Sequence, residues 1–196
     1  MGAGDKREAQ KILNNSFFML LVTSVLLTFG FLALKEKFLM WFGASQATFP
    51  YANTYVTIYT MGTVFALLST GMNSFLMAQG FSGLGMVTVM LGAVLNIILD
   101  PIFIFGFHMG VEGAAISTLI SRIFCAVVVL WKLRDESKPI FVKQYLSIRP
   151  DFGLIKKILF IGIPSGIENS MFQFGKLAIQ STVSTLGTVA IAAQAM

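Results

Sequence analysis

Residues 96–121 read NIILDPIFIFGFHMGVEGAAISTLIS, an apolar helix that meets Asp100 and Pro101, turns at a glycine-containing corner and enters a second apolar helix. Asp100 is the only charged residue in residues 38–111. A carboxylate costs about 2.5–3.5 kcal/mol at the centre of a bilayer, so we expect it to face protein or water. Because proline removes a backbone donor and clashes with the preceding turn, the pair predicts a helix break, a functional site, or both.

The composition is that of an integral membrane protein. Of the 196 residues, 56% are hydrophobic and 12% are charged, whereas a soluble domain carries about 25% charged residues. The net charge of +5 comes from basic residues that flank apolar runs. Cytoplasmic loops of membrane proteins have this pattern, and it does not indicate a nucleic-acid partner. We therefore predict an all-α, polytopic bundle of transmembrane helices in a lipid bilayer.

The apolar runs predict five membrane spans and the beginning of a sixth, at about 20 residues a span. Charged residues 35–37 close the first run, and the turn cluster at residues 79–83 divides the long run that follows. Residues 38–47 are expected to form a separate amphipathic piece at the membrane interface. The predicted spans cover residues 12–34, about 49–78, about 84–107, about 111–131 and about 158–181, and residues 188–196 begin the sixth.

Residues 132–157 form a long polar loop that is rich in lysine and arginine. We interpret it as a linker between an N-terminal lobe, residues 1–131, and the start of a C-terminal lobe, residues 158–196. If the N-terminus is cytoplasmic, the inside segments hold ten Lys and Arg residues and the outside segments hold two. This asymmetry predicts a cytoplasmic N-terminus and linker, and an extracytoplasmic corner that contains His108.

The fifth predicted span carries a polar stripe, with Glu168 beside it and Pro164 four residues before Glu168. One interpretation is the wall of a solvated cavity, in which Glu168 binds a proton, Na⁺ or an organic cation and Pro164 acts as a hinge. The other is interhelical hydrogen bonding, with Glu168 neutralised by Lys176. The stripe residues recur every three or four positions, as one helical face requires: Ser165, Asn169, Gln173, Lys176, Gln180 and Ser184.

A second set of polar residues lies in the third and fourth predicted spans. Asn96 and Asp100 are four residues apart and share a helical face, which makes both candidates for binding substrate or ion. Counted back from the corner, Asp100 and Arg122 lie within about 5 Å of the same depth. Because buried charges in membranes usually pair, we predict an ion pair between Asp100 and Arg122 that fixes the two helices.

No enzyme motif accompanies these residues. The sequence has no metal-ligand spacing and no glycine-rich loop before a Lys-Ser or Lys-Thr pair. We expect a protein that is not an enzyme and needs neither a metal nor an organic cofactor. An ion gradient or a partner would supply the energy for any work it does.

Three motifs together resemble the multidrug and toxic compound extrusion (MATE) family. NIILDPIFIFG followed by GVEGAAISTLISR, within residues 96–122, is similar to the fifth and sixth helices of that family. GAGDKREA, residues 2–9, resembles the loop after its second helix. GIPSGIENSMFQFGKL, residues 162–177, resembles the start of its seventh.

The resemblance implies a fragment of a two-lobed, twelve-helix antiporter of the cell membrane that exports organic cations or drugs in exchange for Na⁺ or H⁺. The fragment would hold helices three to seven and the start of eight, and the remaining helices would be its partners. Glu168 would lie where the second lobe often carries polar or acidic residues. Two alternatives stay open. One is a lipid-linked oligosaccharide flippase of the same superfamily, with more cationic residues lining its cavity, and the other is a non-functional truncated membrane fragment.

Overall fold

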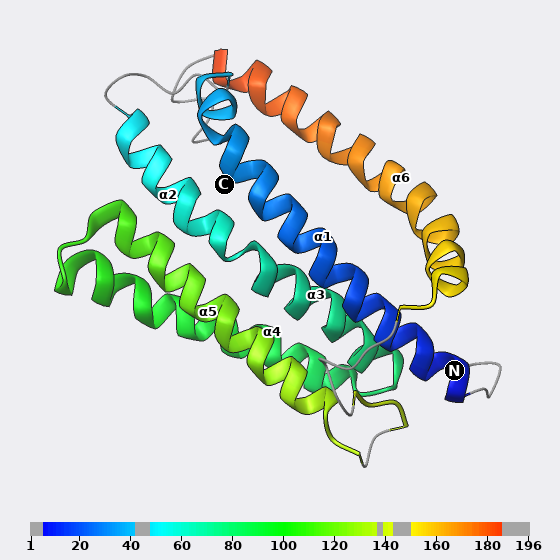
Figure 1. Cartoon of the computed structure of the whole chain (residues 1–196). Coiled ribbons are helices and arrows are strands. Elements are labelled where there is room, and N and C mark those ends of the chain that lie inside the picture. Colours follow the sequence, from blue (N-terminus) through cyan, green and yellow to red (C-terminus); the bar gives the residue numbers. More distant parts are fainter. Residues whose placement is uncertain (1–5, 42–47, 137–138, 143–149, 186–196) are drawn as a thin grey trace. The chain divides into compact units, whose positions relative to one another are not determined.

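The computed structural model describes residues 6–41, 48–136, 139–142 and 150–185. The regular structure in these residues is entirely helical (Figure 1), which confirms the predicted all-α fold. The chain divides into two compact units, Met1–Pro150 and Asp151–Met196. The elements of the first unit are α1 (Lys6–Trp41), α2 (Phe49–Met61), α3 (Thr63–Ala78), α4 (Ser82–Pro101), the π-helix η1 (Ile102–Gly106) and α5 (Gly110–Leu133), and the second unit holds α6 (Phe152–Thr185).

α5 contacts α2, α3, α4 and η1, whereas α1 packs against α2 and α3. α4 and α5 lie side by side, and α2 and α3 follow one another along α1 (Figure 1). α5 also contacts both α2 and α3, so it joins the two layers of the bundle. Functional residues on α5 therefore have neighbours on several other helices.

Three segments are long and apolar enough to cross a membrane: Lys6–Met40, Ser82–Gly106 and Gly110–Leu133. They correspond to the first, third and fourth predicted spans. The second predicted span is not one straight helix, because α2 and α3 are bent by 43° at Gly62 and qualify as a span only when taken together. The described part of the chain thus holds three such spans, or four with the bent pair.

α6 is not among these candidate spans, although residues 158–181 form the fifth predicted span. The polar residues of the stripe lower the mean hydropathy of α6. The helix is therefore long enough to cross a bilayer but not apolar enough to count as a candidate span. A helix of this kind needs protein or water along its polar face to be stable in a bilayer. Residues 188–196, the predicted start of a sixth span, lie outside the described residues.

α1 continues as one helix through the charged residues 35–37 and ends at Trp41. Residues 38–41 are therefore not the separate interfacial piece that the sequence predicts, and residues 42–47 lie outside the described part. Lysine and glutamate are good helix formers, so charge alone does not end the helix. Just after the apolar run, Lys35 Nζ on α1 donates to Thr57 Oγ1 on α2 at 2.8 Å, a hydrogen bond that joins the two helices.

The two turns of the first unit differ in kind. The predicted turn at residues 79–83 is present, and Gly80 adopts a φ of +90° there, a conformation that glycine reaches without steric cost. At the corner after Asp100, the helix does not stop at Pro101 but passes into the π-helix η1. A wider turn accommodates a disturbed hydrogen-bond ladder, and such turns are frequent at functional sites.

The core of the first unit joins α1, α3 and α5 to the short segment 139–142. Ile140 and Val142 in that segment are only 4% and 1% exposed. Its backbone is also held, because Phe141 N donates to Gln10 Oε1 at 3.0 Å and Val142 N donates to the Leu133 carbonyl at 2.9 Å. The buried members of the core are Leu13, Phe17, Leu68, Met72, Leu76, Val129, Leu133, Ile140 and Val142.

This packing corrects the bounds of the predicted linker, residues 132–157. Part of it is built into the core of the first unit, since burial of two aliphatic side chains favours the folded position. α6 then begins earlier than predicted, at Phe152, where Asp151 Oδ1 accepts hydrogen bonds from the backbone N–H groups of Gly153 (3.0 Å) and Leu154 (3.2 Å). An aspartate in this position stabilises a helix start. The assignment of the two units to two lobes stays a prediction.

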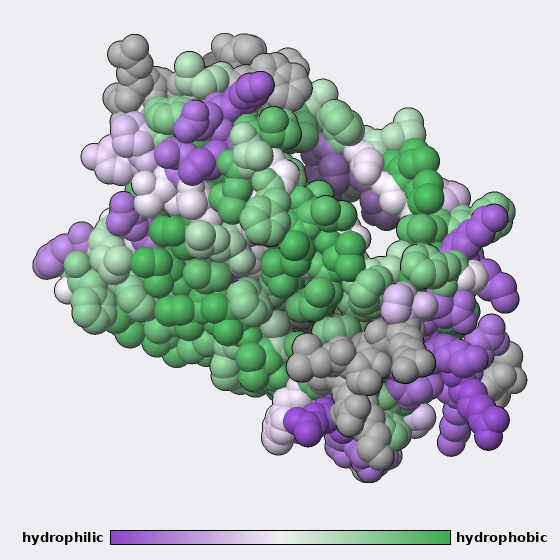
Figure 2. All heavy atoms as spheres, in the orientation of Figure 1, coloured by the Kyte–Doolittle hydropathy of each residue, from purple (hydrophilic) through white to green (hydrophobic). Residues whose placement is uncertain are grey.

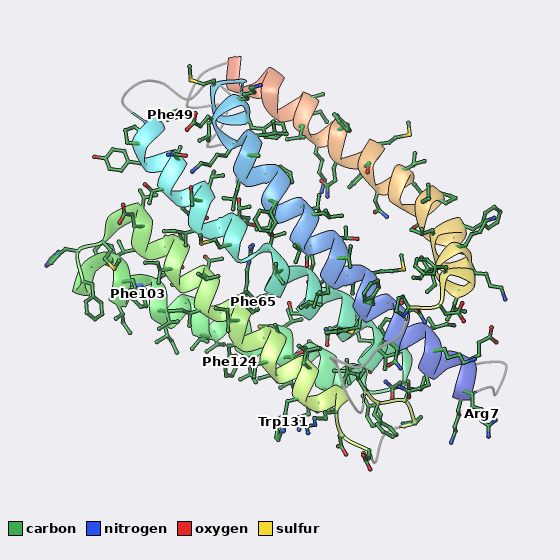
Figure 3. All side chains as sticks on the ribbon, in the orientation of Figure 1. Arg7, Phe49, Phe65, Phe103, Phe124 and Trp131 are labelled. Atoms are coloured by element: carbon green, nitrogen blue, oxygen red, sulfur yellow. The ribbon has the colours of Figure 1, made fainter. Side chains whose placement is uncertain are left out.

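The outer surface of the first unit suits a bilayer. Figure 2 shows hydrophobic side chains over the middle of the face in view and hydrophilic ones toward its ends. Phe29 and Ile97, for example, are 70% and 69% exposed. Trp131, labelled in Figure 3, lies near the end of α5 with Lys132 Nζ 4.7 Å from its ring centroid. Tryptophan beside lysine is typical of a membrane–water interface.

Candidate functional site

The polar stripe predicted on the fifth span lies on α6. The side chains of Ser165, Glu168, Asn169, Gln173 and Lys176 are all exposed. Gln180 and Ser184 also belong to α6, but their side chains fall outside the described part of the chain. The helix continues across Pro164 without a break, so a hinge at this residue stays a prediction.

Within α6, Lys176 does not make the contact with Glu168 that the second interpretation of the stripe includes. Lys176 Nζ lies instead 4.7 Å from the centroid of the Phe172 ring, one turn back along the helix. Glu168 is eight residues away from Lys176, about 12 Å along the axis, which is too far for a direct pair. Asn169 Nδ2 donates to the Ser165 carbonyl at 2.9 Å. Lys176 therefore does not neutralise the carboxylate of Glu168 within α6.

The second candidate site lies in the first unit, around Asp100. Asn96 and Asp100 do share a face of α4, and Asn96 Nδ2 donates to Asp100 Oδ1 at 3.4 Å. Ser117 on α5 donates its hydroxyl proton to the same oxygen. Ser117 is completely buried and Asp100 is half-buried. Ser117 is not among the site residues predicted from the sequence.

The predicted ion pair between Asp100 and Arg122 is wrong for the described residues. The Arg122 guanidinium carbon lies 3.9 Å from the centroid of the Tyr59 ring on α2. Arg122 is five residues beyond Ser117, about 7.5 Å further along α5 and turned by about 140° around its axis. Ser117 meets Asp100 on α4, so Arg122 points toward a different helix. Equal depth in the bilayer did not bring the two charges together.

A cavity of about 430 Å³ lies between α3, α4 and α5. Each helix contributes one face to it, and Asn96 belongs both to this lining and to the Asp100 cluster. Sequence reasoning did not find the cavity, although the spacing of Ser69, Thr70 and Asn73 along α3 is a signal for it. The lining residues are Ala66, Ser69, Thr70, Asn73, Thr88, Val89, Gly92, Ala93, Asn96, Thr118, Ser121, Arg122, Cys125 and Val129.

Neutral hydrogen bonds hold one side of this cavity. Asn73 Nδ2 donates to the Gly85 carbonyl at 3.2 Å, and Thr88 Oγ1 donates to the same carbonyl at 2.7 Å. The close contact of α3 and α4 there depends on Gly85, since a Cβ at that position would lie 2.8 Å from Met77 Cγ. The Ser121 hydroxyl, by contrast, is buried and has no hydrogen-bond partner.

These arrangements can bind ions and polar ligands, but they do not resemble a catalytic centre. The part of the chain that the structure describes has no group of three or more His, Cys, Asp or Glu side chains that could hold a metal ion. His108 is exposed at the corner between η1 and α5, away from the Asp100 cluster in sequence and in hydrogen bonding. The candidate site residues can therefore act on a ligand through hydrogen bonds and charge.

Comparison with known proteins agrees with a membrane transporter. The MatE family model matches residues 1–102. The multidrug export protein MepA of Staphylococcus haemolyticus (strain JCSC1435) is 27% identical over 194 residues, which cover 98% of this chain and 42% of that protein. The chain thus spans about 42% of the length of the curated relatives it matches.

Solved structures of the same kind superimpose well. A MATE protein in the bent conformation is 26% identical with a TM-score of 0.84, and the match covers 95% of this chain and 42% of that chain. The outward-facing conformation of a multidrug resistance MATE family transporter of the MOP superfamily is 28% identical with a TM-score of 0.82, over 95% of this chain and 41% of that chain.

Proposed function

This chain belongs to the MatE family, and we propose that it forms part of a secondary antiporter that exports organic cations or drugs across the cytoplasmic membrane in exchange for Na⁺ or H⁺. The similarity of nearly the whole chain to a multidrug export protein carries the proposal. The apolar spans of the first unit support the membrane location. Members of a transporter family bind and release their ligands unchanged, so the protein is not an enzyme.

In this proposal, residues 1–131 belong to the N-terminal lobe and residues 158–196 begin the C-terminal lobe. The connection between them, like the N-terminus, is cytoplasmic. The remaining helices of the full-length transporter would pack against both. The Lys and Arg asymmetry supports this orientation, because positively charged segments are retained on the cytoplasmic side.

Asp100 is the proposed site for the coupling ion in the first unit. Its carboxylate oxygen already accepts hydrogen bonds from Asn96 and Ser117, both neutral donors. No opposite charge among the described residues neutralises it, so an arriving proton or Na⁺ can do so. The oxygen atoms of Asn96 and Ser117 can turn toward a bound Na⁺, because hard cations prefer oxygen ligands.

Glu168 and its neighbours Asn169, Gln173, Lys176 and Gln180 are the proposed site for an organic cation on α6. The exposed polar face suits water or a ligand better than lipid. An organic cation and a coupling ion would compete for the Glu168 carboxylate, because one carboxylate cannot neutralise two cations well. Competition of this kind links export to ion entry.

The flippase alternative predicts several cationic residues around the cavity. Among the residues that line the cavity described above, Arg122 is the one that carries a positive charge. One cationic residue is fewer than the flippase alternative predicts. Transport of a lipid-linked oligosaccharide by the full-length protein would favour the flippase over the cation antiporter.

The test uses the full-length protein in proteoliposomes, with ethidium as the probe cation and Na⁺ and H⁺ gradients imposed separately. One of the two gradients should drive ethidium against its own gradient. Glu168→Gln should lower that rate about tenfold, the cost of one charge-assisted interaction, while Glu112→Gln, an exposed carboxylate at the start of α5, should not. No export under either gradient would overturn the proposed function, and export unchanged by Glu168→Gln would exclude Glu168 from the site.

A further inference from the structure

We propose that the C-terminal end of α5 is a binding site for an anionic phospholipid, in which Lys132 and Arg134 hold the phosphate of the headgroup and Trp131 packs beside the glycerol region. In the membrane orientation proposed above, this end of α5 lies in the cytoplasmic leaflet. The site goes beyond the proposed export of cations, because its ligand is a component of the bilayer that stays there. Lipid binding at this site therefore does not depend on transport.

The first reason is a hollow of about 280 Å³ at this end of the helix. Its lining consists of Trp131, Lys132, Arg134 and Asp135. The volume is just below the range of about 300–1,000 Å³ for sites that enclose a drug-sized ligand, so the hollow suits a headgroup rather than an entire lipid. Two cations and one carboxylate give the lining a net positive charge, which favours an anion.

The second reason is that the two cations have few partners of their own. Lys132 Nζ lies 4.7 Å from the centroid of the Trp131 ring, and stacking on a ring leaves N–H donors of the ammonium free for an anion. Within the described ranges, no ion pair or hydrogen bond joins the Arg134 guanidinium to another residue. Its planar set of N–H donors matches a pair of phosphate oxygens.

The third reason is an apolar stripe on the outer face of α5. Phe124, Val127 and Trp131 recur at intervals of three and four, as one helical face requires, and they are 41%, 58% and 67% exposed. Figure 3 labels Phe124 and Trp131 on the side of α5 that faces away from α3. In a bilayer this stripe faces acyl chains and ends at the hollow. A soluble phosphate would use the cations but not the stripe, so the whole surface matches a lipid.

A role confined to the helix itself predicts something different. Lysine and arginine in the last turn stabilise the C-terminus of a helix whatever lipid surrounds it. The backbone already satisfies carbonyls at this end, because Arg134 N donates to the Leu130 carbonyl at 3.1 Å and Val142 N donates to the Leu133 carbonyl at 2.9 Å. If helix stabilisation is the only task of the two cations, their loss lowers stability and leaves lipid binding unaffected. Lipid binding and stability must therefore be measured together.

The test follows the labelling of a single peptide. The purified full-length protein in detergent is mixed with phosphatidylglycerol that carries a photoactivatable diazirine in the upper part of one acyl chain. After illumination, peptide mass spectrometry should find label on the peptide that contains Phe124, Val127 and Trp131. The yield of label on this peptide reports on the proposed site even if the full-length protein binds other lipids elsewhere.

Three competitors then identify the ligand. Dioleoyl-phosphatidylglycerol and dioleoyl-phosphatidylcholine have the same acyl chains and differ in net charge. The anionic lipid should halve the labelling at a mole fraction at least about tenfold lower than the zwitterionic lipid. Soluble glycerol 3-phosphate carries the phosphate without acyl chains, and at a tenfold molar excess over the labelled lipid it should not compete.

Variants assign the binding to the two cations. Lys132→Gln and Arg134→Gln should each raise the amount of labelled lipid needed for half-maximal labelling about fivefold, the usual effect of one basic residue near an anionic membrane surface. The double variant should raise it about twentyfold or more. Lys156→Gln combined with Lys157→Gln, at two exposed residues of α6, removes the same charge elsewhere and should behave like the wild type. Thermal unfolding shows whether each variant is folded.

The competitor series on the wild-type protein tests the proposal even if the double variant does not fold. Absence of label from the α5 peptide would overturn it, and so would equal competition by the two lipids. Competition by glycerol 3-phosphate would show a site for a soluble phosphate, and equal weakening in the Lys156 and Lys157 control would show a diffuse effect of charge. Either result would also overturn the lipid site. None of these outcomes affects ethidium export, so the two proposals fail separately.

Discussion

Asp100 and Arg122 show how single charges are held in apolar helices of this protein. Asp100 accepts hydrogen bonds from the neutral donors Asn96 and Ser117, and Arg122 stacks on Tyr59. Each charge is thus partly compensated by its own neighbours. Neither arrangement neutralises the charge, so both residues can still respond to an ion or ligand of opposite sign.

A pair of double-mutant cycles tests this separation. Asp100→Ala and Ser117→Ala should be coupled by about 0.5–3 kcal/mol, because the two side chains share a hydrogen bond. Asp100→Ala and Arg122→Ala should be additive within about 0.5 kcal/mol, because the residues share no partner. The free energy of unfolding of the full-length protein in detergent, titrated with sodium dodecyl sulfate, measures both. If Asp100 were coupled more strongly to Arg122 than to Ser117, the ion pair between Asp100 and Arg122 would be supported instead.

Among the elements, the corner from α4 to α5 brings two backbone segments close together. A Cβ at Gly113, in the first turns of α5, would lie 2.8 Å from the Phe103 carbonyl carbon and 2.9 Å from its oxygen. Phe103, labelled in Figure 3, belongs to the π-helix η1. Only glycine lets the two backbones approach this closely, and this approach sets how Ser117, one turn later, meets Asp100.

Gly113→Ala should therefore destabilise the protein by about 1–3 kcal/mol, as overpacking against a rigid backbone does. Gly83→Ala in α4 is the control, since a Cβ there meets nothing within 4 Å. It should be neutral or stabilising by about 0.5–1 kcal/mol, because alanine favours helix. Thermal unfolding in detergent compares the two. Equal stability of both variants would contradict the tight corner.

At the scale of the whole molecule, the first unit contains a segment beyond its membrane spans, residues 139–142. Segment 139–142 returns to the core beside α1 and α3 after α5 has ended, and Gln10 and Gln79 hold its backbone. The polar region between α5 and α6 is thus partly a structural component of the first unit. A segment tied to this end of the bundle should stay on the same side of the membrane as the N-terminus of α1.

Membrane topology follows from this arrangement and from the Lys and Arg asymmetry. In the full-length protein with its native cysteines replaced, a membrane-impermeant maleimide added to intact cells should label His108→Cys. It should label Lys143→Cys, a position outside the described residues, only after the cells are opened. Immunoblotting of both variants controls for expression. The reverse pattern would overturn the orientation and the lobe assignment.

The helices themselves were predictable from the sequence. Hydropathy located α1, α4 and α5 as spans, the spacing of Asn96 and Asp100 placed them on one face, and the turn before α4 was marked by Gly80. These features depend on contacts within a few residues. Helical hydrogen bonds join positions four apart, and apolar runs report on solvent directly.

The partners of the polar side chains became clear only when the helices were packed. The hydroxyl of Ser117 on Asp100, the Tyr59 ring under Arg122, the cavity around Ser121 and the return of segment 139–142 all join residues from different helices. Such contacts depend on the rotation and axial shift of each helix against its neighbours. A shift of one residue turns a side chain by about 100°. Small residues at close approaches, such as Gly113, set that rotation, and its outcome emerges only from the packing of the whole bundle.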